Sequence, residues 1–163
     1  MIKRLDPITD ESLLRTAFEW DAKYPSWFKQ SSTVFGANDV NVFLDRLRDC
    51  ILIGIFDSEL VGLLILKQVI PHHFEADLCA KRGTDLNVLT KGVYQVIRDF
   101  LKMGMQEGFC LVAEKNLAIR KLCGNMGMTH DGCCVFKGTY RNRVIKWMRY
   151  SIKPEAVQME QAA

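Results

Sequence analysis

Two carboxylate side chains with a spacing suited to acid–base chemistry lie near the middle of the 163-residue chain. Glu75 and Asp77 stand two residues apart in a segment, Phe74 to Ala80, that alternates weakly between apolar and polar residues. Side chains at i and i+2 of a strand point to the same face, so this segment would place both carboxylates side by side. Neighbouring carboxylates raise the pKa of one of them towards neutrality, which suits a general base. A solvated sheet face explains the same pattern, and for each residue taken alone it is the better interpretation.

Further reactive side chains are spread along the chain. Glu114 follows the next predicted strand and is another candidate base. His72 and His73 precede the carboxylates, where a histidine can act as a base through water, although surface histidines in a turn are the commoner outcome. The six cysteines contain no CxxC spacing, so we predict no metal site and interpret them as reduced thiols. Cys133 and Cys134 are adjacent and could be redox-active, but small buried hydrophobic side chains are the more ordinary interpretation.

The elements that must position these side chains begin with two amphipathic helices. Thr9-Asp10 can cap the first helix, which we expect to continue to about residue 24. A loop with Trp27 and Phe28 follows, and Asn38-Asp39 can cap the second helix. The second helix is predicted from apolar residues at i, i+3, i+4 and i+7, namely Val40, Phe43, Leu44 and Leu47.

The pattern changes to strands after Cys50. Apolar runs over 51–56 and 60–69 flank a polar turn, which predicts a hairpin. We then expect a third strand over 74–80, a long helix over 89–101, a strand over 109–113, a short helix over 116–126 and strands at 135–136 and 144–152. Hairpins imply antiparallel pairing, whereas the strand–helix–strand unit implies parallel pairing. The predicted fold class is therefore α/β, with a mixed, mostly antiparallel central sheet flanked by helices on both faces. We expect one domain over 1–152 and a C-terminal tail over 153–163.

The composition is that of an ordinary globular protein. The hydrophobic share is 48% and the charged share 25%. A net charge of +3 is too mild to argue for a nucleic-acid partner. The sequence contains no apolar run long enough to cross a bilayer, and the segment Met1 to Arg4 is not followed by the apolar block of a secretory signal. We therefore expect a cytoplasmic protein without a membrane or nucleic-acid partner.

The segment from Asn116 to Met128 carries a resemblance to a known family. After a predicted buried strand it reads NLAIRKLCGNMGM, in which Asn116, Leu122 and Gly127 fall in register with a common pattern of the Gcn5-related N-acetyltransferase (GNAT) superfamily. Met128 takes the place of the aromatic residue that usually follows the glycine. Gly127 also has a physical interpretation, since a glycine after a helix supplies the left-handed backbone of a C-terminal cap. The order of the predicted elements is similar to that of this superfamily as well.

A second, weaker match lies before the long helix. GNAT proteins bind the pyrophosphate of CoA in a loop that reads roughly Arg-Gly-x-Gly-x-Gly. This chain resembles the loop at Arg82, Gly83 and Leu86, with Thr84 at a variable position, whereas Asp85 and Asn87 replace the later glycines. A carboxylate facing the phosphates would repel them, but Asp85 can instead cap the helix and point away. A working phosphate loop and a simple helix cap are left as equal alternatives.

The resemblance implies further roles for individual residues. In GNAT enzymes an amine attacks acetyl-CoA directly in a ternary complex, and the backbone around Leu78, Cys79 and Ala80 would hold the thioester and pantetheine. Many relatives have a tyrosine as general acid where this chain has Cys123, so Cys123 is a candidate acid, with Tyr140 in a later loop as a substitute. A buried small hydrophobe is the more ordinary interpretation of Cys123. Asn116 would touch the ligand, and the loop with Trp27 and Phe28 lies where acceptor pockets are usually built.

Two functions follow from the resemblance. The first is an acetyl-CoA-dependent N-acetyltransferase that acts on an unknown amine. The second is a catalytically inactive GNAT-fold protein with a binding or virion-assembly role, which the altered phosphate loop and the missing tyrosine both favour. In its altered loop the chain also resembles small bacteriophage proteins of this fold. In that case a phage assembly partner and association with the virion are expected. Exposed strand edges in this fold often pair, so a homodimer is also an expectation.

Overall fold

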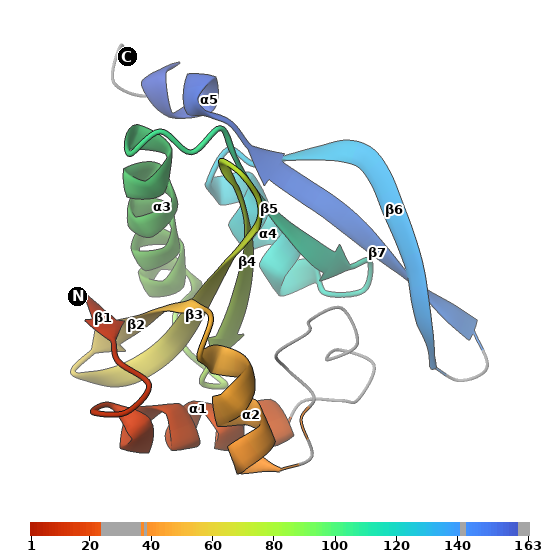
Figure 1. The fold of residues 1–163 in the computed structure, drawn as a ribbon. Helices are drawn as coiled ribbons and strands as arrows, with labels where there is room; N and C mark the ends of the chain where they lie inside the picture. Colours follow the sequence, from red (N-terminus) through yellow and green to blue (C-terminus); the bar gives the residue numbers. More distant parts are fainter. Residues whose placement is uncertain (24–36, 38, 141–142, 160–163) are drawn as a thin grey trace.

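In the part of the chain that the structure describes, seven strands form one open sheet in the order β1-β2-β3-β4-β5-β7-β6 (Figure 1). The computed structural model describes residues 1–23, 37, 39–140 and 143–159. Within these ranges β4 and β5 pair in parallel, and the other neighbouring strands pair antiparallel. This mixed, mostly antiparallel sheet confirms the predicted fold class. The strands are β1 Ile2–Leu5, β2 Ile51–Asp57, β3 Glu59–Ile70, β4 His73–Ala80, β5 Glu107–Ala113, β6 Thr129–Tyr140 and β7 Arg143–Ile152.

Helices cover both faces of the sheet, and each buries an apolar stripe. On one face, α1 and α2 enclose a core that includes Leu14, Phe43 and Leu63. On the other face, α3 and α4 pack over a larger core, into which α3 inserts side chains at helical spacing such as Leu89 and Val93. The structure therefore confirms the predicted second helix, which begins at Val40, and the helices predicted over 89–101 and 116–126. The helices are α1 Glu11–Ala22, α2 Val40–Leu47, α3 Leu86–Lys102, α4 Leu117–Asn125 and α5 Pro154–Met159.

Three elements differ from the sequence-based expectations. β1 was not predicted, because four residues at the edge of a sheet show no clear alternation and are ordered by pairing with a distant strand, with Ile2 opposite Ile55. β6 begins six residues earlier than the predicted strand at 135–136, because its polar start pairs with β7. The helix α5 lies in the segment separated as a tail, and its Val157 is 4% exposed within the core beside α3. The domain boundary after residue 152 stays a prediction.

The parallel strands β4 and β5 diverge soon after they meet. Their pairing runs over three residue pairs, from His73 opposite Glu107 to Glu75 opposite Phe109. Beyond this point β4 continues along β3 to Ala80, while β5 continues along β7. The close approach at the meeting point requires Gly108, because a β-carbon there would lie 2.5 Å from the Phe74 ring. The two strands therefore form a V, and Figure 1 shows β4 and β5 separating with α4 behind the opening.

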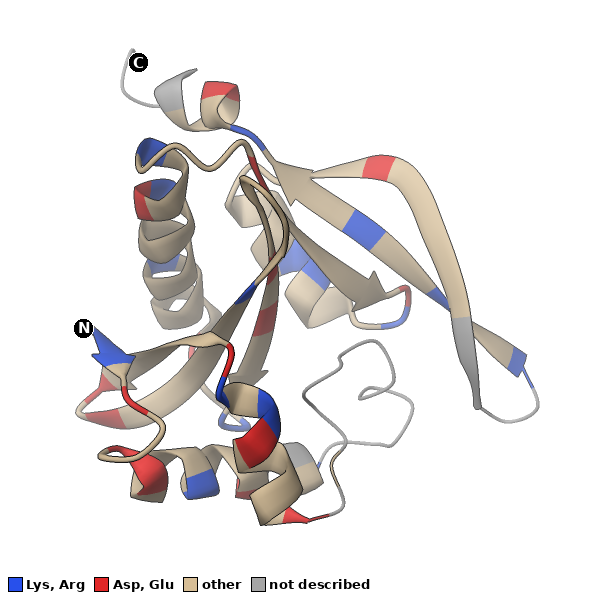
Figure 2. Ribbon diagram, viewed as in Figure 1, with Lys and Arg blue, Asp and Glu red and all other residues tan. Residues whose placement is uncertain are grey.

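Figure 2 shows acidic and basic residues interspersed over the ribbon, with both signs on α1, α2 and α3. Among the described residues, no helix is long and apolar enough to cross a membrane. The expected absence of a nucleic-acid partner stays a prediction.

Candidate functional site

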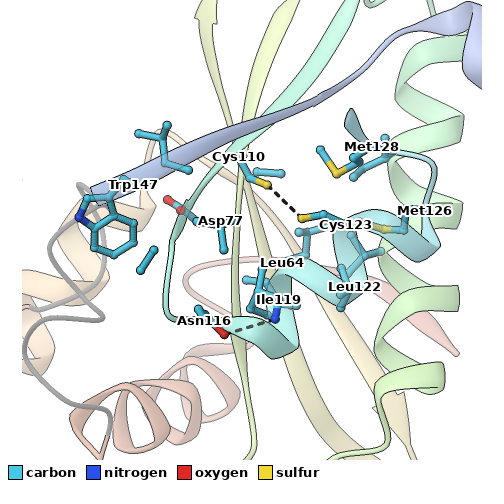
Figure 3. Close-up of a pocket in the computed structure, with 17 residues that line it drawn as sticks. Leu64, Asp77, Cys110, Asn116, Ile119, Leu122, Cys123, Met126, Met128 and Trp147 are labelled. Atoms are coloured by element: carbon cyan, nitrogen blue, oxygen red, sulfur yellow. Dashed lines mark hydrogen bonds between the residues drawn. The ribbon is translucent and has the colours of Figure 1, made fainter. Parts of the chain in front are cut away.

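A cavity of about 70 Å³ opens where β4 and β5 diverge (Figure 3). Its floor is apolar and comes from the sheet and from α3 and α4, whereas Asp77 and Asn116 add polar atoms. This composition is typical of small-molecule sites, in which a few polar groups orient a ligand in an apolar pocket. The lining residues are Leu64, Ala76, Asp77, Leu78, Val93, Ile97, Cys110, Leu111, Val112, Ala113, Asn116, Ile119, Leu122, Cys123, Met126, Met128 and Trp147.

The two candidate carboxylates on β4 lie in different surroundings. Asp77 lies beyond the last β4–β5 pair and lines the cavity, where Figure 3 shows its carboxylate between Trp147 and Cys110. Glu75 belongs to the last pair, opposite Phe109, and stands opposite Lys67 on β3; it does not line the cavity. Both side chains are half-buried. The divergence of the strands thus distinguishes two residues that the sequence pattern treats alike.

The helix α4 is capped at both ends, and residues at both ends line the cavity. The Asn116 side-chain oxygen accepts a hydrogen bond from the Ile119 N–H at 3.3 Å, which caps the N-terminus. At the other end Gly127 has φ of 73°, and the Met128 and Gly127 N–H groups donate to the carbonyls of Cys123 and Gly124. This is a Schellman motif, and it confirms the predicted glycine cap. Asn116 therefore lines the cavity with a side chain whose oxygen is engaged in capping.

Two thiols meet at the centre of the cavity wall. The Sγ atoms of Cys110 on β5 and Cys123 on α4 lie 3.6 Å apart, and Cys123 is 1% exposed. The hydrogen bond with Cys123 and burial together raise the pKa of Cys110 well above its ordinary value, and the negative charges of Asp77 and Glu75 act in the same direction. Cys110 is therefore a thiol at neutral pH. The sequence analysis singled out Cys123 but missed Cys110, because the contact joins residues that are 13 positions apart.

The loop between β4 and α3 makes hydrogen bonds within itself and to the first turn of α3. Asp85 is the N-cap of α3, and its side chain accepts a hydrogen bond from the Asn87 N–H at 2.8 Å. Gly83 has φ of 87°, a left-handed conformation, and the Thr84 hydroxyl donates to the Lys81 carbonyl at 2.7 Å. The structure therefore shows Asp85 as a helix cap. Arg82 is exposed at the same turn.

The residues predicted to hold the thioester take up both sides of β4. Leu78 and Ala80 pack partly against the core beside α3. Cys79 is buried on the opposite face, where its Sγ donates to the Ala17 carbonyl at 3.6 Å. A role for Cys79 in binding is therefore limited to its backbone, since its side chain belongs to the core under α1.

Other predicted site residues lie outside the cavity or outside the described part of the chain. Glu114 is exposed just before α4, and its N–H donates to the Lys146 carbonyl on β7 at 2.9 Å. His73 lies 3.9 Å from the Glu107 carboxylate at the start of the V. Tyr140 ends β6, but its side chain is outside the described residues, as are Trp27 and Phe28.

Trp147 is a site residue that the sequence analysis missed. It is 3% exposed on β7, packs with Ala113 and Ile145, and lines the cavity near Asp77. The alternation of Ile145, Trp147 and Arg149 along β7 indicates one shared face of this strand. The sequence does not show that this face borders the opening of β4 and β5.

Solved structures of acetyltransferases share this architecture. Spermidine N-acetyltransferase SpeG from Vibrio cholerae, solved as a mutant, aligns with a TM-score of 0.75 and 10% identity over 99% of each chain. An acetyltransferase of the GNAT family from Streptococcus pneumoniae aligns with a TM-score of 0.71 and 13% identity, over 94% of this chain and 98% of that one. The protein yncA from Salmonella typhimurium, solved with its cofactor acetyl-CoA, aligns with a TM-score of 0.70 and 12% identity, over 94% and 93%.

These similarities define the fold of the chain. No protein-family model matches the sequence, and no curated protein sequence matches it. At identities of 10–13% the structural likeness concerns architecture rather than site chemistry. The chain has the fold of the GNAT acetyltransferases, as the segment from Asn116 to Met128 predicted.

Proposed function

We propose that this protein is an N-acetyltransferase that transfers the acetyl group of acetyl-CoA to an amine. The main support for this proposal is the V between β4 and β5. It opens onto an apolar cavity that Asp77 and Asn116 border. Transfer by direct attack needs two substrates held in contact, a polarised carbonyl and a group that removes a proton. The cavity and the diverging strand edge supply places for these functions.

The acyl donor would lie along the second half of β4. The β4–β5 ladder ends at Glu75 although β4 continues to Ala80, so β5 does not cover the edge formed by Leu78, Cys79 and Ala80. An extended pantetheine arm can use such an edge for backbone hydrogen bonds, as a peptide does when it adds to a sheet. The loop from Lys81 to Asp85 and the start of α3 would receive the phosphates, since a helix N-terminus favours anions and Asp85 is turned to its own helix.

Asp77 is our candidate base and Cys123 our candidate acid. Asp77 borders the cavity, so its carboxylate can accept the proton that the amine loses as it attacks. Cys123 lines the wall and carries a thiol that can donate a proton to the departing CoA thiolate. Glu75 is the second candidate base, because it stands outside the cavity lining. Tyr140 is the second candidate acid, and its side chain is outside the described residues. The acceptor is an amine of unknown structure; SpeG, by its name, acts on spermidine.

The alternative of an inactive protein in binding or virion assembly gains no support from the comparisons. The departures that suggested it now have structural accounts. Asp85 caps α3 through the Asn87 N–H, and Cys123 lies on the cavity wall. A homodimer, a phage assembly partner and the cellular location stay predictions.

Binding of the donor can be tested before the acceptor is known. Acetyl-CoA at millimolar concentration should raise the melting temperature, because a ligand specific for the native state stabilises it. Acetate and adenosine at the same concentration are the matched controls. Acetylation of a panel of amines, followed by mass spectrometry of the product, then tests transfer. The absence of both a melting shift and an acetylated product would refute the proposed function.

A further inference from the structure

Two cysteines from different elements touch inside the cavity. Cys110 on β5 and Cys123 on α4 have their sulfur atoms 3.6 Å apart, and Figure 3 shows the contact at the centre of the wall. The other described cysteines have different surroundings. Cys79 bonds a backbone carbonyl of α1, and Cys134 lies 3.8 Å from a ring nitrogen of His130.

We propose that Cys110 and Cys123 form a reversible disulfide that ties β5 to α4 and closes the cavity. An S–S bond is about 2 Å long, so the sulfur atoms need to approach by roughly 1.5 Å. Rotation of the two side chains, with a small shift of α4, can supply this approach. The nine-residue α4 is a short element, and it is held to β7 by the Arg120 Nε–H, which donates to the Tyr150 hydroxyl at 3.1 Å.

The cavity also provides the route for an oxidant. Both cysteines line the same opening as Asp77 and Asn116, so a small disulfide that enters the cavity reaches their sulfur atoms. The oxidant class is a low-molecular-weight disulfide, RSSR. A cysteine thiolate attacks one sulfur, forms a mixed disulfide and releases one RSH; the second cysteine then attacks the protein sulfur and releases the other RSH. In total, two protein thiols are oxidised, one RSSR is reduced, and the two thiol protons leave on the two RSH molecules.

The surroundings of the pair make this exchange pH-dependent. The thiolate is the attacking species, and the raised pKa of Cys110 keeps its thiol protonated at neutral pH. The exchange should therefore be slow at neutral pH and accelerate as the pH rises. The negative charges of Asp77 and Glu75 contribute to the raised pKa of Cys110, since they disfavour its thiolate.

Closure would affect the donor site. A cavity of about 70 Å³ tolerates little inward movement of α4, and a disulfide would remove the Cys123 thiol that we propose as acid. Oxidised protein should therefore lose acetyl-CoA binding, and a dithiol reductant should restore it. This consequence rests on the proposed function, whereas disulfide formation itself does not.

Peptide mapping tests the disulfide directly. The full chain is incubated at pH 8 with bis(2-hydroxyethyl) disulfide, a small disulfide. Residual thiols are blocked with iodoacetamide, and the protein is weighed and digested with trypsin. After blocking, the bridged chain carries carbamidomethyl groups on four rather than all six cysteines and has lost two hydrogens. We therefore expect it to weigh about 116 Da less than the blocked, reduced chain. We also expect a linked pair of peptides covering 103–115 and 122–137.

The second peptide also contains Cys133 and Cys134, so variants are needed to locate the bond. The Cys133→Ser/Cys134→Ser double variant should keep the linked pair, and Cys123→Ser should lose it. Absence of the linked pair from the native protein, or its loss in the double variant, would overturn the proposal. Both measurements are independent of CoA.

The donor-site consequence has its own readout. Melting shifts with acetyl-CoA are compared before and after oxidation, and again after dithiothreitol, for the natural chain and for Cys110→Ser. We expect oxidation to abolish the shift of the natural chain alone. An unchanged shift in protein shown by mass to be bridged would refute closure. No shift in reduced protein, together with no acetylated product, would refute the proposed function and leave the disulfide result standing.

Discussion

At the scale of single residues, position along a diverging strand separates side chains that look equivalent in the sequence. Glu75 and Asp77 have the same charge, similar burial and the same strand, yet the β4–β5 ladder ends between them. We therefore prefer the carboxylate that lines the cavity as the candidate base. Position also decides the role of Asp85, whose carboxylate accepts a hydrogen bond from the Asn87 N–H in the first turn of α3.

Asp77→Asn should reduce kcat by about 100-fold, because a neutral amide cannot accept the proton of the attacking amine. The KM for acetyl-CoA should change little. Glu75→Gln is the matched control and should keep most of the activity. Steady-state kinetics with the amine that supports turnover provide the measurement, and equal losses in the two variants would contradict the assignment.

Asp85→Ala should lower the free energy of unfolding by about 1 kcal/mol, since it removes the N-cap of α3. Asp85→Asn should retain most of the stability, because its side-chain oxygen can accept the same hydrogen bond. Urea titration measures both. If alanine and asparagine were equally harmful, the charge rather than the cap would be responsible.

At the scale of elements, a buried ion pair joins β5 to β7 where the V begins. The Arg149 guanidinium donates to both oxygens of Glu107 at 2.7 and 3.3 Å, and it stacks over the Phe109 ring at 4.4 Å from the ring centre. Glu107 is 9% exposed. Glu107 also stands opposite His73 in the first of the three residue pairs between β4 and β5.

Arg149→Met should destabilise the protein by about 3 kcal/mol, because it leaves the Glu107 carboxylate buried without its charge partner. The double variant Arg149→Met/Glu107→Gln should recover much of this loss, since no buried charge remains. Denaturant unfolding of the single and double variants completes the cycle. Additive losses would show that the two side chains do not act as a pair.

Asp131 on the neighbouring strand β6 also bonds Arg149 through its carboxylate, and this contact predicts a pH effect. Burial raises the pKa of Asp131, but the Cys133 N–H and Arg149 lower it by more, so its pKa lies below the ordinary value of 3.8. A lowered pKa in the folded state gives stability that is present above pH 3.8 and is lost as the pH falls through the lower, folded value. In Asp131→Asn, acid unfolding below pH 4 should be less steep. An unchanged slope would contradict this contribution.

At the scale of the whole molecule, the chain closes its larger core with its last described helix. Val157 of α5 is buried with the side chains of α3, although it follows the predicted domain by five residues. Val157→Ala should cost about 2 kcal/mol of stability, because it removes buried methyl groups. Ala156→Ser at an exposed neighbouring position is the control. Thermal unfolding compares them, and equal effects would show that α5 is not part of the core.

Local patterns predicted most elements correctly. The helical stripe of α3, the strand β5, and the C-terminal cap of α4 at Gly127 all depend on residues within a few positions of one another. Such features are readable because side-chain period and capping chemistry act over one or two turns. The resemblance of the segment 116–128 to GNAT proteins rests on the same kind of local pattern.

The tertiary structure alone decided what long-range pairing controls. It placed β1 beside β2 across about fifty residues, separated Asp77 from Glu75 at the end of a ladder, and brought Cys110 to Cys123. It also turned Asp85 towards α3, a choice that the sequence left open. The physical reason is that a local pattern specifies which face of an element is apolar, while the distances between elements follow from how those faces pack together.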